Sequence, residues 1–198
     1  MAADSLKKDA TTGTNAPSLK SNVLYQKVHP NFGKSGFQEP LTTVQGFILG
    51  LLARGHTSSD KKTLELATSV LNSGEALSGS GIALFTTLLI EEERELKSKS
   101  LNLFVPGLGE GTPSERVQAL IDIAYGFTLG FCGESQPIAG SIVQMNYKEL
   151  NDELHEHLNL IEDLVHIDAA SGANADDIKL VHETLSTTIV RLAELMAS

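Results

Sequence analysis

The sequence predicts an all-α fold: a single multi-helical domain of about six to seven helices. Apolar residues recur at the three- and four-residue spacing of a helix face in several long segments, and no segment alternates long enough to suggest a strand. The chain has 198 residues, of which 41% are hydrophobic, so it can bury one substantial core. Because only 5% of the residues are aromatic and tryptophan is absent, that core must consist mainly of leucine, isoleucine, valine and alanine.

The N-terminal 21 residues differ in composition from the rest of the chain. They lack periodicity and are rich in serine, threonine, alanine and lysine, so we expect a disordered tail over 1–21 and a helical domain over 22–198. A short helical turn and a loop are expected within 22–39. The longer helices are expected over 41–54, 60–71, 82–99, 113–132, 136–145, 146–167 and 174–196.

Helix-start signals justify the first of these elements. Pro40 lies directly before the first long helix, a position that tolerates proline, and Ser58 or Ser59 is the expected cap of the second helix. Thr112 and Glu115 form a capping box with a proline at the first helical position. The third helix changes from apolar to charged over 91–99, so we expect its second half to leave the core for solvent.

Further start signals divide the C-terminal half of the chain. Asn146 and Glu149 form another capping pair, and the sequence SGAN at 171–174 breaks the chain. Asn174 is followed by Asp176 and Asp177, which favour a helix N-terminus because of the helix dipole.

Two predicted helices share the pattern G-F-x-L-G, at Gly46–Gly50 and at Gly126–Gly130. Glycines four residues apart lie on one helix face and remove the side chains there, which lets two backbones approach closely. Each glycine costs about 1 kcal/mol of helix propensity, so packing must offset it. We expect these helices to cross each other, or each to cross a third helix, at the glycines. The alternative is that the small-residue surface receives a helix of a partner.

Charge and composition set several function classes aside. The formal charge is −10, which disfavours nucleic-acid binding because polyanions need clustered cations. Five lysines precede Glu39, and they indicate a solvated tail more than an anion-binding arm. No apolar run reaches the roughly 18 residues of a membrane span, and the N-terminus lacks the apolar stretch of a signal peptide. We therefore expect a cytoplasmic protein that binds neither nucleic acid nor membrane.

Metal, cofactor and catalytic motifs are also missing from the sequence. Cys132 is the only cysteine and lies in an apolar helix, so we expect a buried, inert thiol. The pairs Asp152/His155 and Asp163/His166 share one helix stripe but lie about 16 Å apart by helix rise, too far to share a metal. The glycines at 107, 109 and 111 match neither a P-loop nor a dinucleotide-binding pattern. We expect no catalytic residues, no metal and no cofactor.

The order of motifs resembles the YgfB/YecA-like family of bacterial proteins over about residues 35–196. The residues that carry the resemblance are Leu41, Thr42, Gly46, Gly50, Pro106, Arg116, Ala119, Leu120, Phe127, Gly130, Val190 and Arg191. The resemblance implies an all-helical fold without established catalytic residues.

This chain departs from the family pattern at several polar positions. Thr43 and Gln45 stand where the family has an acid and a histidine, and Ile123 replaces its tryptophan. The acidic loop is reduced to Glu110. The single cysteine also excludes the Cys-rich metal module of the longer members.

Two functional hypotheses follow from these features. The first is a non-enzymatic interaction or regulatory adaptor protein that binds another protein through an apolar loop. The residues expected to bind are Leu103, Phe104, Val105, Leu108 and Arg116. The second is a small-molecule binder or enzyme with a pocket near Arg116, Gln45 and Tyr125. Arg116 itself faces an apolar side and needs a partner, either an acid such as Glu110 or a bound anion.

The last helix also carries a spaced apolar series that could support a homodimer. Its members are Ile178, Val181, Leu185, Thr188, Leu192 and Leu195. The alternative is ordinary core packing.

Overall fold

The computed structural model describes residues 23–107, 110–132, 152–170 and 172–197. Every regular element in these ranges is a helix, which confirms the all-α expectation. The elements are α1 (Val23–Val28), η1 (a 3₁₀ helix, His29–Lys34), α2 (Leu41–Ala53), α3 (Lys62–Leu71), α4 (Gly79–Lys97), α5 (Pro113–Cys132), α6 (Asp152–Val165) and α7 (Ala175–Ala197). The expected tail over 1–21 and the expected helix over 136–145 lie outside the described residues, as does the 146–149 capping pair.

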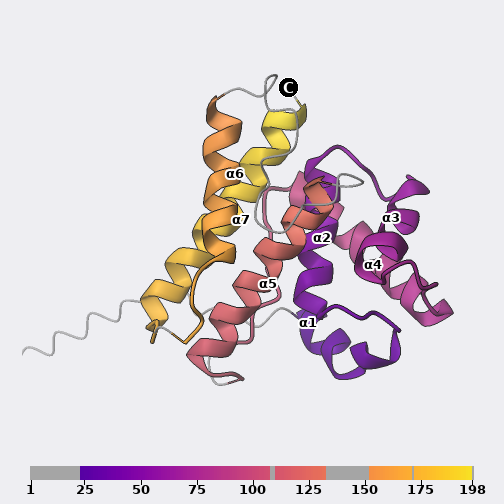
Figure 1. The fold of residues 1–198 in the computed structure, drawn as a ribbon, viewed down its shortest axis with the longest axis horizontal. Coiled ribbons are helices and arrows are strands. Elements are labelled where there is room, and N and C mark those ends of the chain that lie inside the picture. The colour runs from indigo at the N-terminus through magenta and orange to yellow at the C-terminus, as the bar shows by residue number, and fades with distance from the viewer. Residues whose placement is uncertain (1–22, 108–109, 133–151, 171, 198) are drawn as a thin grey trace, which may run out of the picture.

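Helix α2 is the centre of the molecule, and all thirteen of its residues are buried. Figure 1 shows α2 beside α5, with α6 and α7 on one side of this pair and α3 and α4 on the other. The sequence predicted burial of α2 on both faces because one face is apolar and the other consists of small residues.

Helices α2 and α5 cross each other at their four glycines. A side-chain carbon on Gly46 would overlap the carbonyl of Ile123, and one on Gly50 would overlap the carbonyl of Phe127. On the opposite helix, Gly126 and Gly130 make the equivalent approaches to backbone carbonyls of α2. The two backbones therefore touch, and the lost helix propensity of the glycines is offset by this close packing.

The core divides into two clusters on either side of the α2–α5 pair. One cluster joins α5 to α6 and α7, and the other joins α2 to α3, α4 and α1. The spaced apolar series on α7 lies in the first cluster: Leu185 and Leu192 are fully buried there, and Val181 packs against it. These side chains are used for packing within the chain, which corrects the expectation that they support a homodimer.

Residues 101–107, which follow α4 and form no helix, link the two clusters. Phe104 lies in the cluster of α2–α4, whereas its neighbours Leu103 and Val105 lie in the cluster of α5–α7. A hydrogen bond from Val105 N–H to the Leu103 carbonyl (2.8 Å) turns the chain at Phe104, so this side chain points to a different cluster from its two neighbours. All three are at most 5% exposed. They therefore offer no docking surface, and the expectation of an apolar partner-contact loop is wrong for them; Leu108 lies outside the described residues.

Helix α4 does not leave the core where its sequence becomes charged. Glu92 is only 2% exposed, while Arg94 and Lys97 on the other side of the helix reach solvent. One face of the second half of α4 packs against neighbouring elements, so Glu92 on that face is buried although it belongs to a run of charged residues. The expectation that the second half is entirely solvated is therefore corrected at Glu92.

The helix starts agree with the predicted caps except in α3. The Thr112 hydroxyl accepts from Glu115 N–H (3.2 Å), and Thr112 N–H donates to the Glu115 carboxylate (2.7 Å), which forms the capping box. Asn174 caps α7 through hydrogen bonds from the N–H groups of Asp176 and Asp177. At α3 the predicted Ser58 or Ser59 is not the cap, because Asp60 accepts from the first helical N–H instead (3.0 Å).

Candidate binding groove

A groove of about 510 Å³ lies between α1, η1, the start of α2, the first half of α5 and three residues that precede α5, namely Pro106, Glu110 and Gly111. Its walls contain more polar groups than any other surface hollow that we describe. The residues that line it are Tyr25, Gln26, His29, Pro30, Leu41, Thr42, Pro106, Glu110, Gly111, Glu115, Gln118, Ala119 and Asp122.

Helix α5 supplies one wall because four of its residues share a face. Positions 115, 118, 119 and 122 follow the three- and four-residue helical spacing, so their side chains line the same side. Asp122 is held by two donors: the Thr42 hydroxyl on α2 (3.0 Å) and the Gln118 side-chain amide (2.8 Å). These contacts fix the direction of its carboxylate at the groove.

A second wall is the segment that precedes α5, and Arg116 holds it in place. The guanidinium Nη2 donates to the carbonyls of Gly107 (3.0 Å) and Gly111 (2.9 Å). Glu110 lies between these carbonyls in sequence and accepts from Gly107 N–H (3.1 Å) and from the Gln26 amide of α1 (2.7 Å). The wall is therefore tied both to α5 and to α1.

Aromatic side chains form the third wall. The Tyr25 ring lies 4.8 Å from the His29 ring and 5.7 Å from the buried Phe104 ring, centroid to centroid. Burial raises the pKa of the Tyr25 hydroxyl, and the nearby carboxylates of Glu110 and Glu115 raise it further. Both effects favour the neutral phenol, so Tyr25 presents an uncharged ring and hydroxyl to the groove.

The electrostatic character of the groove is acidic. Three carboxylates line it, at Glu110, Glu115 and Asp122, and none of its lining residues is a lysine or an arginine. Hydrogen bonds from Thr112 lower the pKa of Glu115, so this carboxylate stays ionised at neutral pH. Glu115 and Asp122 are two helical turns apart, about 10 Å by helix rise, so the negative charge is spread along the groove.

The structure separates the residues that sequence reasoning placed in one pocket. Arg116 lies behind the groove wall and is 6% exposed, Gln45 is fully buried, and Tyr125 is 42% exposed. None of the three lines the groove, although Glu115 and Ala119, on either side of Arg116, do. In the described residues, Arg116 donates to the backbone carbonyls of Gly107 and Gly111, which take the place of the expected acidic partner. Its Nε is buried without a hydrogen-bond partner, and a bound anion stays a prediction.

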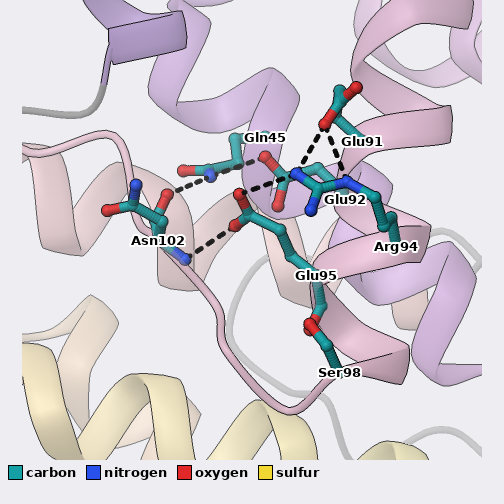
Figure 2. A network of polar contacts seen from close by, with 7 residues as sticks. All are labelled: Gln45, Glu91, Glu92, Arg94, Glu95, Ser98 and Asn102. Atoms are coloured by element: carbon teal, nitrogen blue, oxygen red, sulfur yellow. Dashed lines mark hydrogen bonds and ion pairs between the residues drawn. The ribbon is translucent and has the colours of Figure 1, made fainter.

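Gln45 instead belongs to a buried polar network between α2, α4 and the 102–104 segment (Figure 2). Its amide nitrogen donates to Glu92 (2.8 Å) and to the carbonyl of Asn102 (3.2 Å), and its oxygen accepts from Phe104 N–H (2.7 Å). Glu95, one turn after Glu92 on α4, accepts from Asn102 N–H (2.9 Å). This network anchors the start of the segment that continues into the groove wall.

A smaller, mainly apolar hollow of about 290 Å³ lies between α5, α6 and α7. Leu120, Leu164 and Ile178 line it together with Asp177 at the start of α7. No side chain there supplies a convergent polar set comparable with that of the groove.

The remaining site expectations concern cysteine, metal and membrane. Cys132 is buried, and burial raises the pKa of its thiol, as expected for an inert core cysteine. Within the part of the chain that the structure describes, no three His, Cys, Asp or Glu side chains are grouped so that they could hold a metal ion. Among the described helices, none has both the length and the apolar character needed to cross a membrane.

Sequence reasoning missed the groove residues. Tyr25 and Gln26 come from α1, Thr42 from α2 and Asp122 from α5, and no local motif joins these elements, which are distant in sequence. The only signal available was the polar stripe of Glu115, Gln118 and Asp122 on α5, which is also what any solvated helix face shows.

Comparisons with known proteins define the fold only. No protein-family model matches the chain, and no curated protein matches its sequence. Among solved structures, the fold is similar to that in the crystal structure of lpg0076 protein from Legionella pneumophila, with a TM-score of 0.61 and 15% sequence identity. The match covers 87% of this chain and 95% of that chain. At this identity, the likeness supports the all-α architecture and says nothing about activity.

Proposed function

We propose that the protein is an interaction or regulatory adaptor that binds a positively charged segment of another protein in the acidic groove. The observation that carries the proposal is the groove itself, which is lined by three carboxylates and by no lysine or arginine. Opposite charges at such a surface steer association and select partners more than they add raw affinity.

The chemistry of the walls favours lysine and arginine side chains. The carboxylates of Glu110, Glu115 and Asp122 offer acceptors for ammonium or guanidinium donors, and charge-assisted hydrogen bonds are stronger than neutral ones. The ring of Tyr25 adds an aromatic surface on which a cation can rest. Because the carboxylates are spread over more than one helical turn, the groove suits two or more cations along an extended chain.

The test measures binding of a fluorescently labelled peptide with alternating arginine and glycine residues. The triple variant Glu110→Gln, Glu115→Gln, Asp122→Asn removes the charges but keeps acceptors for Gln26, Thr112 and Thr42. We expect at least a tenfold loss of affinity, since several charge pairs of roughly 0.5 kcal/mol or more are removed. A matched control, Glu156→Gln, Asp163→Asn, Glu183→Gln, changes exposed carboxylates outside the groove and should bind like the unaltered protein. Equal affinity of the groove variant and the control would contradict the proposal.

A second candidate function is binding of a small organic cation by the same groove. It is favoured by the groove's volume of about 510 Å³, which lies within the range of small-molecule sites. Spermidine and the labelled peptide distinguish the two functions. If spermidine binds more tightly than the peptide and displaces it, the small-molecule function is supported; if the peptide binds at least tenfold more tightly, the adaptor function is supported.

We also propose kinship with the YgfB/YecA-like family and a cytoplasmic location. The ordered matches from Leu41 to Arg191 support the kinship, because they include Gly46, Gly50 and Gly130 at the α2–α5 crossing, together with Phe127. Cell fractionation of the native host tests the location, and recovery of the chain in the membrane or periplasmic fraction would contradict it.

A further inference from the structure

Glu92 is a carboxyl group in the interior of the protein. It lies on α4, where it is 2% exposed, and its Oε1 accepts from the Gln45 amide (2.8 Å). Its second oxygen, Oε2, is buried without a hydrogen-bond partner. Figure 2 shows the carboxyl group at the junction of α2, α4 and the 102–104 segment.

Gln45 has no capacity left for the second oxygen of Glu92. Its amide nitrogen already donates to Glu92 and to the Asn102 carbonyl, which uses both of its protons, and its oxygen accepts from Phe104 N–H. An ionised Glu92 would therefore be a buried charge with a single hydrogen bond. Such a charge is costly unless it is paired, hydrated or neutralised by a proton.

The charged groups near Glu92 also disfavour its ionisation. Burial raises the pKa of Glu92 to about 8, against a lowering by the Gln45 hydrogen bond, and the carboxylates of Glu95 and Glu91 on the same helix raise it further. Arg94 does not compensate, because its guanidinium pairs with Glu91 (2.7 Å) and Glu95 (3.8 Å) on the exposed side. From α2, the group that faces Glu92 is the neutral Gln45 amide. The Asn102 backbone in the neighbouring segment bonds to Gln45 and Glu95, and it is also uncharged.

We propose that Glu92 is a pH-dependent latch on the segment 102–107. With a proton on its carboxyl group, Glu92 closes the contact between α2, α4 and this segment; when it ionises, the carboxylate draws water into the junction and the segment loosens. The segment continues into Pro106 and Gly107 of the groove wall, so the latch couples the wall to pH. Only this last consequence rests on the proposed binding function; the latch itself does not.

The test is an NMR titration of the full chain between pH 4 and pH 9.5 without any ligand. Glutamate labelled with ¹³C at the carboxyl carbon reports the ionisation of Glu92, and backbone amides report the segment. We expect the Glu92 carboxyl to titrate with a midpoint above 7, and the amide signals of Phe104 and Gly107 to shift with the same midpoint. A Glu92 midpoint near the usual 4.5 would overturn the latch, and so would a high midpoint that the two amides do not follow.

Two variants separate the latch from other titrating groups. Glu92→Gln keeps the shape and the contact with Gln45 but cannot ionise, so the shared amide titration should disappear. Glu91→Gln removes a neighbouring, half-exposed carboxylate, and the shared amide titration should persist in this variant. Persistence of the titration in Glu92→Gln would overturn the proposal. If Glu92→Gln does not fold, the carboxyl titration of the unaltered protein still decides. Because no ligand is present, a failure of cation binding leaves this result unaffected.

Discussion

Gly46 on α2 lies directly against the carbonyl group of Ile123 on α5, so closely that any side-chain carbon at position 46 would overlap it. The reciprocal approach brings Gly126 against the carbonyl of Thr43. Both obstacles are helix backbone, which cannot turn aside as a flexible side chain would. The distance between the two central helices is therefore set by glycine at these positions, and both halves of the core pack on this pair.

Alanine at either glycine is expected to destabilise the protein. Gly46→Ala or Gly126→Ala must separate α2 from α5, and we expect a loss of at least about 2 kcal/mol in the free energy of unfolding. Urea denaturation followed by circular dichroism measures it. Gly79→Ala is the matched control, because a side chain there meets nothing within 4 Å, and it should be neutral or slightly stabilising. If all three alanine variants unfold at the same urea concentration, the crossing does not depend on glycine.

The free energy of unfolding should depend on pH through Glu92. The pKa of this group is raised from 4.5 to about 8 in the folded protein, so the unfolded chain releases its proton first. The contribution of Glu92 to stability is fully present below pH 4.5 and is lost as pH rises to about 8. The loss reaches at most about 1.4 kcal/mol per pH unit, and stability does not change further through this group above pH 8. Glu92→Gln lacks this loss, so its advantage over the unaltered protein should grow from pH 5 to pH 8.

Denaturation curves at several pH values check this behaviour. Glu91→Gln provides the comparison, because Glu91 is partly exposed and pairs with Arg94 outside the core. If the free energy of unfolding of Glu92→Gln and that of the unaltered protein depend on pH in the same way, the carboxyl group of Glu92 does not have a raised pKa in the folded protein.

Replacing Arg116 should destabilise the protein, because the segment before α5 loses the side chain that holds it in place. Arg116→Met keeps the length of the side chain in its buried site but leaves the carbonyls of Gly107 and Gly111 without their donor. We expect a loss of about 3 kcal/mol, because buried acceptors that lose a charged donor incur their desolvation cost. Thermal unfolding measures it, with Arg191→Met as the control. Arg191 forms a half-exposed ion pair with Glu153 on α6, where solvent screens the charges, so its replacement should cost far less than that of Arg116. Equal losses in the two variants would exclude a special role for Arg116.

The capping box at the start of α5 gives a further prediction. Thr112→Ala removes the hydroxyl that accepts from Glu115 N–H, and we expect a loss of about 1 kcal/mol in the free energy of unfolding. Glu115→Gln keeps the reverse hydrogen bond, since glutamine serves the same position in this motif, and should cost much less. Chemical denaturation of both variants measures the two losses in the free energy of unfolding. A larger loss in Glu115→Gln than in Thr112→Ala would mean that the charge of Glu115, rather than the hydrogen bonding, stabilises the helix start.

The helices could be predicted from sequence because their signals are local. The Thr112–Glu115 box marks the start of α5, and Asn174 marks the start of α7, because hydrogen bonds within one turn determine both. The paired G-F-x-L-G segments predicted a close helix crossing, since the spacing of Gly46 and Gly50 alone places them on one face. These features need no knowledge of what the helix packs against.

The candidate site could not be predicted because its residues meet only through tertiary packing. Phe104 looks like an exposed apolar loop residue in the sequence, and it becomes core because the segment runs between two clusters. In the sequence, Glu92 looks like a solvated member of a run of charged residues. In the structure it is buried and accepts a hydrogen bond from the Gln45 amide of α2, which is distant in sequence. The groove combines Tyr25 with Asp122, and no sequence pattern connects positions that far apart.

The most direct test of cation binding in the acidic groove is chemical-shift mapping of the arginine–glycine peptide on the ¹⁵N-labelled protein at neutral pH. We predict that the largest shifts fall on Tyr25, Gln26, Gln118 and Asp122, and that they diminish as salt is raised, because salt screens charge pairs. Residues of the apolar hollow, such as Leu164 and Ile178, should be unaffected. Shifts centred on that hollow, or no shifts at millimolar peptide, would contradict the claim that the acidic groove is the binding site.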